Sequence, residues 1–190
     1  MINFTLPLIS YLIGAIPTGY WFCKFFFNID ITKYGSKNIG ATNVSRVLGS
    51  KKFFFLIFFL DFLKAFFTLF LVSYFSVHLF IMAALLLIGN AYSIFLRFKG
   101  GKGVATLLGI LAFFDVKLFL IFVCIWGVLL FVVKRVDIAS LCSCYMITFF
   151  VYPMFLFETI QFFYFLLFIS LWVSFRHRKN IVNFLWRQAE

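Results

Sequence analysis

The sequence predicts an all-α integral membrane protein with seven transmembrane helices, from its composition and from the spacing of its apolar segments. Of 190 residues, 65% are hydrophobic and 12% are charged, with 33 Phe and a mean hydropathy of +1.10. Soluble domains are roughly 45–50% apolar and about 25% charged, so this chain suits lipid as its solvent. A membrane-spanning helix needs roughly 20 apolar residues, so seven of them would use most of the chain. We therefore expect residues 1–190 to form a single transmembrane domain.

Seven apolar segments are the candidates for these helices. No Lys or Arg precedes the first segment, whereas a secretory signal peptide begins with positive charge, so we expect the segment to be retained as a helix. The fourth segment is short, and it is kept because it places the basic residues on one side. The expected spans are residues 4–27, 53–74, 77–96, 104–114, 118–133, 138–156 and 160–175, with short turns near Ser76, Asp115 and Glu158.

Basic residues predict the orientation. The chain has 17 Lys and Arg against 6 Asp and Glu, a formal net charge of +11. With seven spans, fifteen of the 17 cations fall on one side, Lys117 falls on the other, and Lys64 lies inside a span. By the positive-inside rule, the N-terminus is outside and the C-terminus is in the cytoplasm, with the chain in the cell (inner) membrane. We expect no nucleic-acid partner, because no polar fold is available to present a basic face.

The cysteines predict neither a metal site nor a disulfide framework. They lie in apolar runs without a nearby His or a Cys-x-x-Cys pair, at Cys23, Cys124, Cys142 and Cys144. We interpret them as small buried residues. The expected metal and cofactor content is none.

A first polar cluster runs from Lys33 to Arg46, directly after the first span. Its fourteen residues include two Gly, two Asn, two Ser, one Thr and three cations. This density of hydrogen-bonding groups suits a binding loop on the cytoplasmic side. An ordinary solvated loop is the alternative.

A second cluster is the glycine-rich segment Arg97-Phe-Lys-Gly-Gly-Lys-Gly-Val-Ala-Thr106. Glycines at 100, 101 and 103 permit positive φ and close backbone approach, and successive N–H groups in such turns can bind an anion. Lys99 and Lys102 add positive charge, and a helix that starts near Gly103 would direct its N-terminal dipole at that anion. The segment predicts a phosphate cradle, although it is not a Walker P-loop. A flexible basic hinge is the alternative.

A third group is scattered along the last spans. It consists of Ser140 and the segment from Arg176 to Asn180, in which His177 and Asn180 share a helix face. A solvated interfacial histidine is the alternative for His177. Asp61 and Lys64 also share a face, and we expect them to form a salt bridge because unpaired charges are costly at membrane depth.

The residue inventory limits the chemistry. With only six acids, the chain lacks multi-Asp metal sites, and neither His is followed five residues later by Asp. Few general bases therefore remain. Attack on an already activated donor, such as an acyl phosphate, fits this inventory, because the protein then mainly positions the donor and neutralises charge.

Several segments, in order along nearly the whole chain, resemble the bacterial acyl-phosphate:glycerol-3-phosphate acyltransferase (PlsY) family. They are Gly14-Ala-Ile-Pro-Thr-Gly19, Gly35-Ser-Lys-Asn-Ile-Gly-Ala-Thr-Asn43, Leu60-Asp-Phe-Leu-Lys64, Phe98-Lys-Gly-Gly-Lys-Gly-Val-Ala-Thr106, Ala139-Ser140 and Arg176-His-Arg-Lys-Asn-Ile181. The resemblance implies a seven-span enzyme that transfers an acyl group from acyl phosphate to the 1-hydroxyl of glycerol 3-phosphate, giving lysophosphatidic acid and phosphate. It also implies a functional link to the enzyme that produces acyl phosphate. Acyl-chain preference and oligomeric state are left open, and a monomer is compatible with the sequence.

The resemblance also implies the site residues, on the cytoplasmic side. Lys102, His177 and Asn180 are the expected catalytic residues. The expected substrate-binding residues are Ser36, Asn38, Arg46, Lys99, Gly100, Gly101, Lys102, Gly103 and Ser140. Two departures stand out: Asn90 replaces a usual His and cannot carry a proton, and Asp137 replaces a Ser or another small polar residue. Either His177 or the phosphate of the substrate therefore remains as the base.

Two other classes of function fit parts of the sequence. A small transporter or channel for phosphorylated solutes could use the same basic loops, but it would place polar groups along a pathway near the bilayer midplane. Here Asp61 and Lys64 are the main polar groups within a span. A structural assembly factor would need neither the glycine-rich segment nor the Asn-rich loop.

Overall fold

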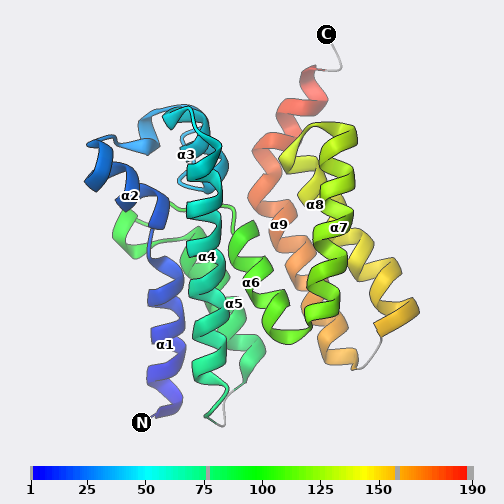
Figure 1. Cartoon of the computed structure of the whole chain (residues 1–190). Coiled ribbons are helices and arrows are strands. Elements are labelled where there is room, and N and C mark those ends of the chain that lie inside the picture. Colours follow the sequence, from blue (N-terminus) through cyan, green and yellow to red (C-terminus); the bar gives the residue numbers. More distant parts are fainter. Residues whose placement is uncertain (1, 76–77, 157–158, 188–190) are drawn as a thin grey trace. The chain divides into compact units, whose positions relative to one another are not determined.

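The computed structural model describes residues 2–75, 78–156 and 159–187, and the regular elements in these ranges are all helical (Figure 1). The all-α prediction is therefore confirmed for this part of the chain. Two compact units are present, residues 1–113 and residues 114–190. The predicted turns near Ser76 and Glu158 lie outside the described residues.

In the described ranges, five helical segments are long and apolar enough to cross a membrane: Lys51–Val72, Leu79–Leu96, Val116–Val133, Val136–Met154 and Ile160–Val182. A bent pair, Thr5–Ala15 with Thr18–Phe27, makes a sixth if it is counted as one span. The remaining apolar helix, α6 (Val104–Phe114), has 11 residues. At 1.5 Å per residue it is about 16 Å long, roughly half the thickness of the hydrocarbon core.

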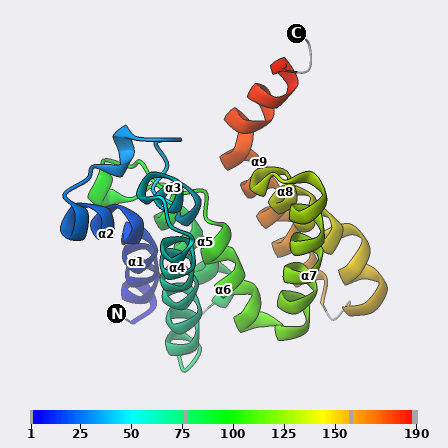
Figure 2. The ribbon, with the colours of Figure 1, turned by 45° about the horizontal axis from the view of Figure 1, so that its top comes forward.

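The first predicted span, residues 4–27, is not one continuous helix, so the prediction of a single helix there is wrong. α1 (Ile2–Ala15) and α2 (Thr18–Phe27) are bent by 46° at a short break (Figures 1 and 2). Pro17 lies in this break. Proline has no backbone N–H and its ring collides with the preceding turn, so a regular helix does not continue through it.

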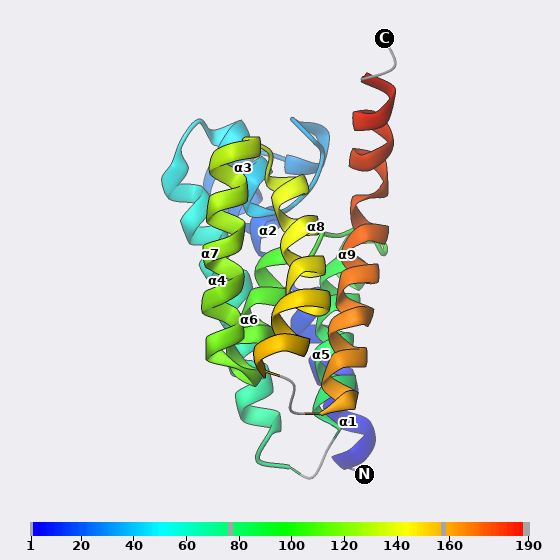
Figure 3. The same cartoon turned by 90° about the vertical axis from the view of Figure 1, so that its right-hand side faces the viewer.

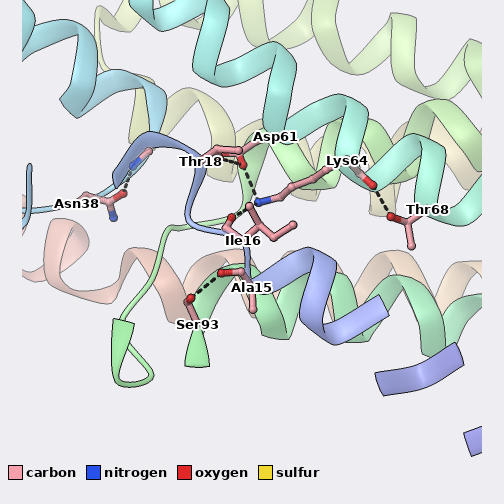
Figure 4. Close-up of polar contacts among 9 residues, drawn as sticks. Ala15, Ile16, Thr18, Asn38, Asp61, Lys64, Thr68 and Ser93 are labelled. Carbon is pink, nitrogen blue, oxygen red and sulfur yellow. Dashed lines mark hydrogen bonds and ion pairs between the residues drawn. The ribbon is translucent and has the colours of Figure 1, made fainter. Parts of the chain in front are cut away.

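Two side chains satisfy the carbonyl groups that the break leaves open (Figure 4). Ser93 Oγ donates to the Ala15 carbonyl at 2.5 Å, and Lys64 Nζ donates to the Ile16 carbonyl at 2.9 Å. Ser93 follows α5 (Leu79–Ala91), and Lys64 lies in α4 (Lys51–Val72). The break is therefore stabilised by α4 and by the segment that follows α5.

The predicted salt bridge between Asp61 and Lys64 is confirmed. Lys64 Nζ lies 2.7 Å from Asp61 Oδ1, and the side chains of Lys64 and Asp61 are 8% and 11% exposed, respectively. Thr18 Oγ1 donates to the same carboxylate oxygen (Figure 4). The pair therefore joins α4 to both sides of the helix break.

α5 packs along α1 with the two backbones in direct contact. A Cβ atom on Gly14 would lie 2.4 Å from the Leu86 carbonyl oxygen, and one on Gly89 would lie 2.2 Å from the Tyr11 carbonyl oxygen. Neither position has room for a side chain. α4 packs against both helices, and the short helix α3 (Ala41–Leu48) packs on α4.

The second unit is built from α7 (Val116–Val133), α8 (Val136–Met146), the π-helix η3 (Ile147–Leu156) and α9 (Ile160–Arg187). The predicted turn at Asp115 is confirmed, since Asp115 Oδ1 accepts the N–H groups of Lys117 and Leu118 at 2.7 and 3.1 Å. α8 packs on both α7 and α9. α9 continues past residue 175, the predicted end of the last span, and extends beyond the ends of α7 and α8 (Figure 3).

The cysteines are free, but only Cys23 and Cys144 are buried. Cys124 and Cys142 lie exposed on apolar helices, so the prediction of burial is wrong for these two. A thiol behaves as a small hydrophobe, and a lipid-facing helix surface accepts it.

Lys64→Met is expected to destabilise the protein strongly. The variant leaves the Asp61 carboxylate without its cation and the Ile16 carbonyl without its donor. Breaking a buried ion pair in this way costs about 3–5 kcal/mol. Thermal unfolding in detergent measures the effect, with Lys51→Met, an exposed change at the start of the same helix, as the control. Equal midpoints for the two variants would contradict the role of Lys64 at the break.

Candidate functional site

A buried asparagine organises the first polar loop. Asn43 is 2% exposed. Its Nδ2 donates to the carbonyls of Tyr34 and Asn38 at 3.0 and 2.8 Å, and its Oδ1 accepts the N–H of Ser36 at 2.8 Å. These three bonds fold residues 34–38 around one side chain. Asn43 was not among the predicted site residues, because composition alone does not distinguish a buried amide from a solvated one.

The predicted binding residues of this loop differ in their exposure. Ser36 and Arg46 are exposed, and Asn38 is half-buried. Asn38 Oδ1 accepts the N–H of Gly40 at 2.8 Å just before α3 begins, so the amide nitrogen of Asn38 faces away from this turn as a donor. The loop therefore offers a hydroxyl, an amide and a guanidinium group.

An aspartate fixes the entry to the loop. Asp30 Oδ1 accepts the hydroxyl of Thr32 at 2.6 Å and the N–H of Thr32 at 3.1 Å, at the start of the 3₁₀ turn η1 (Ile31–Lys33). The Thr32 hydroxyl lowers the pKa of Asp30 below its ordinary value, and the nearby Lys33 acts in the same direction. Asp30 is therefore an ionised cap at neutral pH.

The first loop and the segment before the glycine-rich loop share one apolar cluster. Leu96, in the 3₁₀ turn η2 (Ile94–Leu96), packs against the buried residues of this cluster. Trp21 of α2 contacts Phe95 in a tilted arrangement, with ring centroids 5.5 Å apart. The buried members are Cys23, Ile31, Ile39, Ala41, Val44 and Ile57. The first unit therefore brings the first polar loop against the turn that precedes the glycine-rich segment.

The glycine-rich loop lies directly on the end of α5. Gly101 N donates to the Asn90 carbonyl at 2.8 Å, and a Cβ atom on Gly100 would lie 2.2 Å from the same oxygen. Gly103 has φ +84°, and α6 begins at Val104 as predicted. Positions 100 and 101 thus require glycine because another backbone or side chain lies close to them, whereas position 103 favours glycine because its φ is positive.

Two residues before this loop have a strained backbone. Arg97 and Phe98 have φ values of 52° and 60°, a region that side chains other than glycine seldom adopt. The turn is held by hydrogen bonds from Phe98 N to the Ser93 carbonyl and from Lys99 N to the Leu96 carbonyl. Lys99 is exposed, and Lys102 is half-buried. This turn was not predicted, because Arg and Phe are not residue types that indicate a positive φ.

The Asn90 side chain faces the glycine-rich loop. A Cβ atom on Gly101 would lie 2.9 Å from Asn90 Oδ1. Among the described residues, this buried oxygen has no hydrogen-bond partner. A buried acceptor without a donor costs about 1–3 kcal/mol, so a ligand that brings a donor would be stabilised here.

In the second unit, the Ser140 hydroxyl joins two helices. Its Oγ donates to the Val136 carbonyl at 2.7 Å and accepts Nε1–H of Trp126, in α7, at 3.1 Å. Ser140 is fully buried. Its contacts in this structure are therefore those of a helix-packing residue.

His177 is 2% exposed, so the interpretation as a solvated histidine is wrong. Its Nδ1 lies 2.9 Å from the Val173 carbonyl. Because a carbonyl only accepts, Nδ1 carries the proton and Nε2 is the acceptor nitrogen of the neutral ring. Asn180 lies one turn further along α9, and its Nδ2 donates to Asp137 Oδ2 at 2.9 Å.

The arrangement suits anion binding more than metal binding. The first unit combines lysines, backbone N–H groups and the N-terminus of α6, all of which favour a phosphate group. Within residues 2–75, 78–156 and 159–187, no three His, Cys, Asp or Glu side chains lie close enough to share a metal ion.

Comparison with known proteins gives a consistent result. The profile of the glycerol-3-phosphate acyltransferase family matches residues 4–187. A glycerol-3-phosphate acyltransferase of Fusobacterium nucleatum is 36% identical over 97% of this chain and 95% of its own length. One from Staphylococcus haemolyticus is 38% identical over 93% of this chain and 91% of its own length.

Two solved structures have a similar fold. Both are crystal structures of PlsY (YgiH), an integral membrane glycerol 3-phosphate acyltransferase. The glycerol 3-phosphate form superposes with a TM-score of 0.88 at 32% identity, over 97% of this chain and 92% of that one. The lysophosphatidic acid form gives a TM-score of 0.84 at 34% identity, with the same coverage.

Gly100→Ala is expected to lower the midpoint of thermal unfolding. The added Cβ atom would lie 2.2 Å from the Asn90 carbonyl oxygen and 2.7 Å from that of Ala91, both backbone atoms. Such overpacking typically costs about 1–3 kcal/mol. Gly127→Ala is the matched control, since nothing lies within 4 Å of its Cβ position. The close contact has no energetic importance if both variants unfold at the temperature of the unchanged protein.

Proposed function

The chain belongs to the glycerol-3-phosphate acyltransferase family, and we propose that it uses acyl phosphate as donor and releases lysophosphatidic acid and phosphate. It is an acyltransferase of the membrane, with glycerol 3-phosphate as acceptor. In the proposed reaction, the 1-hydroxyl oxygen of the acceptor bonds to the acyl carbon. The bond between that carbon and the phosphate oxygen breaks, and the phosphate leaves with the electron pair.

One observation carries the choice of donor. The half-buried Lys102 lies between Gly101 and Gly103 in a loop that leads directly into the N-terminus of α6. A phosphate leaving group gains negative charge as the acyl bond breaks, and preorganised cations and N–H groups stabilise that charge. An acyl phosphate therefore suits this loop. The reaction then depends on another enzyme that supplies the acyl phosphate.

We assign the expected site residues of each unit separately. We assign phosphate binding in the first unit to Ser36, Asn38, Arg46, Lys99, Gly100, Gly101, Lys102 and Gly103. In the second unit we assign contacts with the substrates to His177 and Asn180, and we assign support of the site to Ser140, whose buried hydroxyl joins α8 to α7. The family match over residues 4–187 includes both units, which supports a single acyltransferase domain.

The proton of the attacking hydroxyl leaves mainly through the phosphate of the substrate in this proposal. Asn90 cannot take a proton, and the hydroxyl of Ser140 already donates to a backbone carbonyl. His177 is the competing base, because Nδ1 donates to the Val173 carbonyl and Nε2 is the nitrogen that accepts a proton when the ring is neutral. We assign His177 and Asn180 to substrate positioning.

Purified protein with acyl phosphate and labelled glycerol 3-phosphate tests the proposed function, with lysophosphatidic acid as the product detected. Lys102→Ala is expected to lower the rate about 10²–10³-fold. Removing one group that stabilises transition-state charge has an effect of this size in other enzymes. Lys117→Ala, an exposed lysine at the start of α7, is the control. Product from acyl-CoA but none from acyl phosphate would overturn the donor assignment.

His177→Gln distinguishes the two bases. Glutamine keeps hydrogen bonding but loses proton transfer, so the variant should retain much of its activity and the shape of its pH–rate profile. Steady-state rates between about pH 5 and 8 measure this. Loss of activity together with the acidic limb of the profile would identify His177 as the general base.

We propose a topology of seven spans, with α6 as a short fourth span and the N-terminus outside. The supporting observation is the charge distribution, since fifteen of the 17 cations then lie on the cytoplasmic side of a bacterial inner membrane. Reporter fusions near Asp115 should be active outside the cell, and fusions after Glu190 should be active inside. A cytoplasmic signal near Asp115 would rule out seven spans.

A further inference from the structure

Asp137 connects two helices at the N-terminal end of α8. Asn180 Nδ2, from α9, donates to Asp137 Oδ2 at 2.9 Å. Arg135 donates to the same carboxylate, with Nη2 2.8 Å from Oδ2 and Nε 3.3 Å from Oδ1. The Asp137 side chain is 14% exposed. Both of its oxygens are therefore engaged, one of them by the amide of Asn180.

The carboxylate determines which edge of the Asn180 amide faces it. An ionised carboxylate only accepts hydrogen bonds, and the neighbouring guanidinium of Arg135 favours the ionised form. The NH₂ group of Asn180 must then face Asp137, and Oδ1 must face the opposite direction. An asparagine without such a partner could present either its oxygen or its nitrogen to a substrate.

We propose that Asp137 is a positioning residue, which turns the amide oxygen of Asn180 toward the attacking hydroxyl of glycerol 3-phosphate. This inference rests on the proposed function, in which Asn180 contacts the acceptor. Asn180 Oδ1 accepts a hydrogen bond from the 1-hydroxyl. This bond directs the hydroxyl oxygen toward the acyl carbon that it attacks. The amide takes no proton, so the proton passes to the substrate phosphate or to His177.

Arg135 has a second effect in this arrangement. Both proposed substrates are anions, and an unpaired carboxylate beside Asn180 would repel them. The guanidinium of Arg135 balances that charge at a distance of 2.8 Å. Asp137 can therefore orient Asn180 without adding net negative charge.

A purely structural role makes different predictions. If Asp137 acts only through its salt bridge with Arg135 at the start of α8, then Asp137→Ala and Arg135→Gln should lower stability and rate alike. If Asp137 acts through Asn180, its removal should resemble the removal of Asn180. Measurements of kcat for the single variants and for the double variant of Asp137 and Asn180 distinguish the structural role from the positioning role.

The test measures kcat, the KM for each substrate and the midpoint of thermal unfolding for the purified full-length protein. The probes are acyl phosphate and labelled glycerol 3-phosphate. The variants are Asp137→Ala, Asn180→Ala, their combination, and Arg135→Gln. Asp137→Asn is the second change at position 137, in case alanine prevents folding, because it keeps an acceptor oxygen but lets the Asn180 amide turn either way.

We expect Asp137→Ala and Asn180→Ala each to lower kcat about tenfold or more, with the KM for acyl phosphate unchanged. The double variant should be no slower than Asn180→Ala, because the two residues act as one unit. Arg135→Gln should keep more of its kcat than Asp137→Ala, since Asn180 retains its acceptor. Asp137→Asn should give an intermediate kcat.

The failures are distinguishable. Additive effects in the double variant, or equal losses in Arg135→Gln and Asp137→Ala, would overturn the positioning role of Asp137. The positioning role would also be overturned if Asn180→Ala kept full activity while Asp137→Ala had a lowered kcat. Absence of transfer in the unchanged protein would instead overturn the proposed donor.

Discussion

The break between α1 and α2 is the constraint on which the rest of the first unit depends. A backbone carbonyl that loses its helical partner needs another donor, because the hydrocarbon region offers no water. Ser93 and Lys64 are these donors, and they come from different parts of the chain. Asp61 and Lys64 are the main polar groups within a span, as a transport pathway would require. Their position is explained here by the backbone carbonyl that Lys64 stabilises.

The same break directs α2 away from α1 and brings its Trp21 against Phe95, next to the glycine-rich loop. The polar loops therefore rest on buried apolar contacts and on fixed main-chain hydrogen bonds. Strain at Arg97 and Phe98 is compatible with this support, because the hydrogen bonds of the turn hold the chain in place. A loop prepared in this way loses little freedom when an anion binds, which favours electrostatic stabilisation.

Hydropathy was sufficient to predict most of the helices, because a span of apolar residues has few alternatives in lipid. It did not reveal the break at Pro17, since both sides of the break are equally apolar. The glycine-rich loop and the pair of Asp61 with Lys64 were predictable from spacing and charge. The roles of Asn43 and of Asp137 were not, because each depends on partners that only the folded chain brings within hydrogen-bond distance.

The contact between α1 and α5 has a mechanical consequence. Side chains can absorb small displacements by changing rotamer, but Gly14 and Gly89 leave two backbones touching with nothing adjustable between them. We therefore expect α1 and α5 to move together as one rigid body. Asn90 follows Gly89 directly, and its carbonyl accepts the N–H of Gly101, so backbone contacts alone connect α1 to the glycine-rich loop.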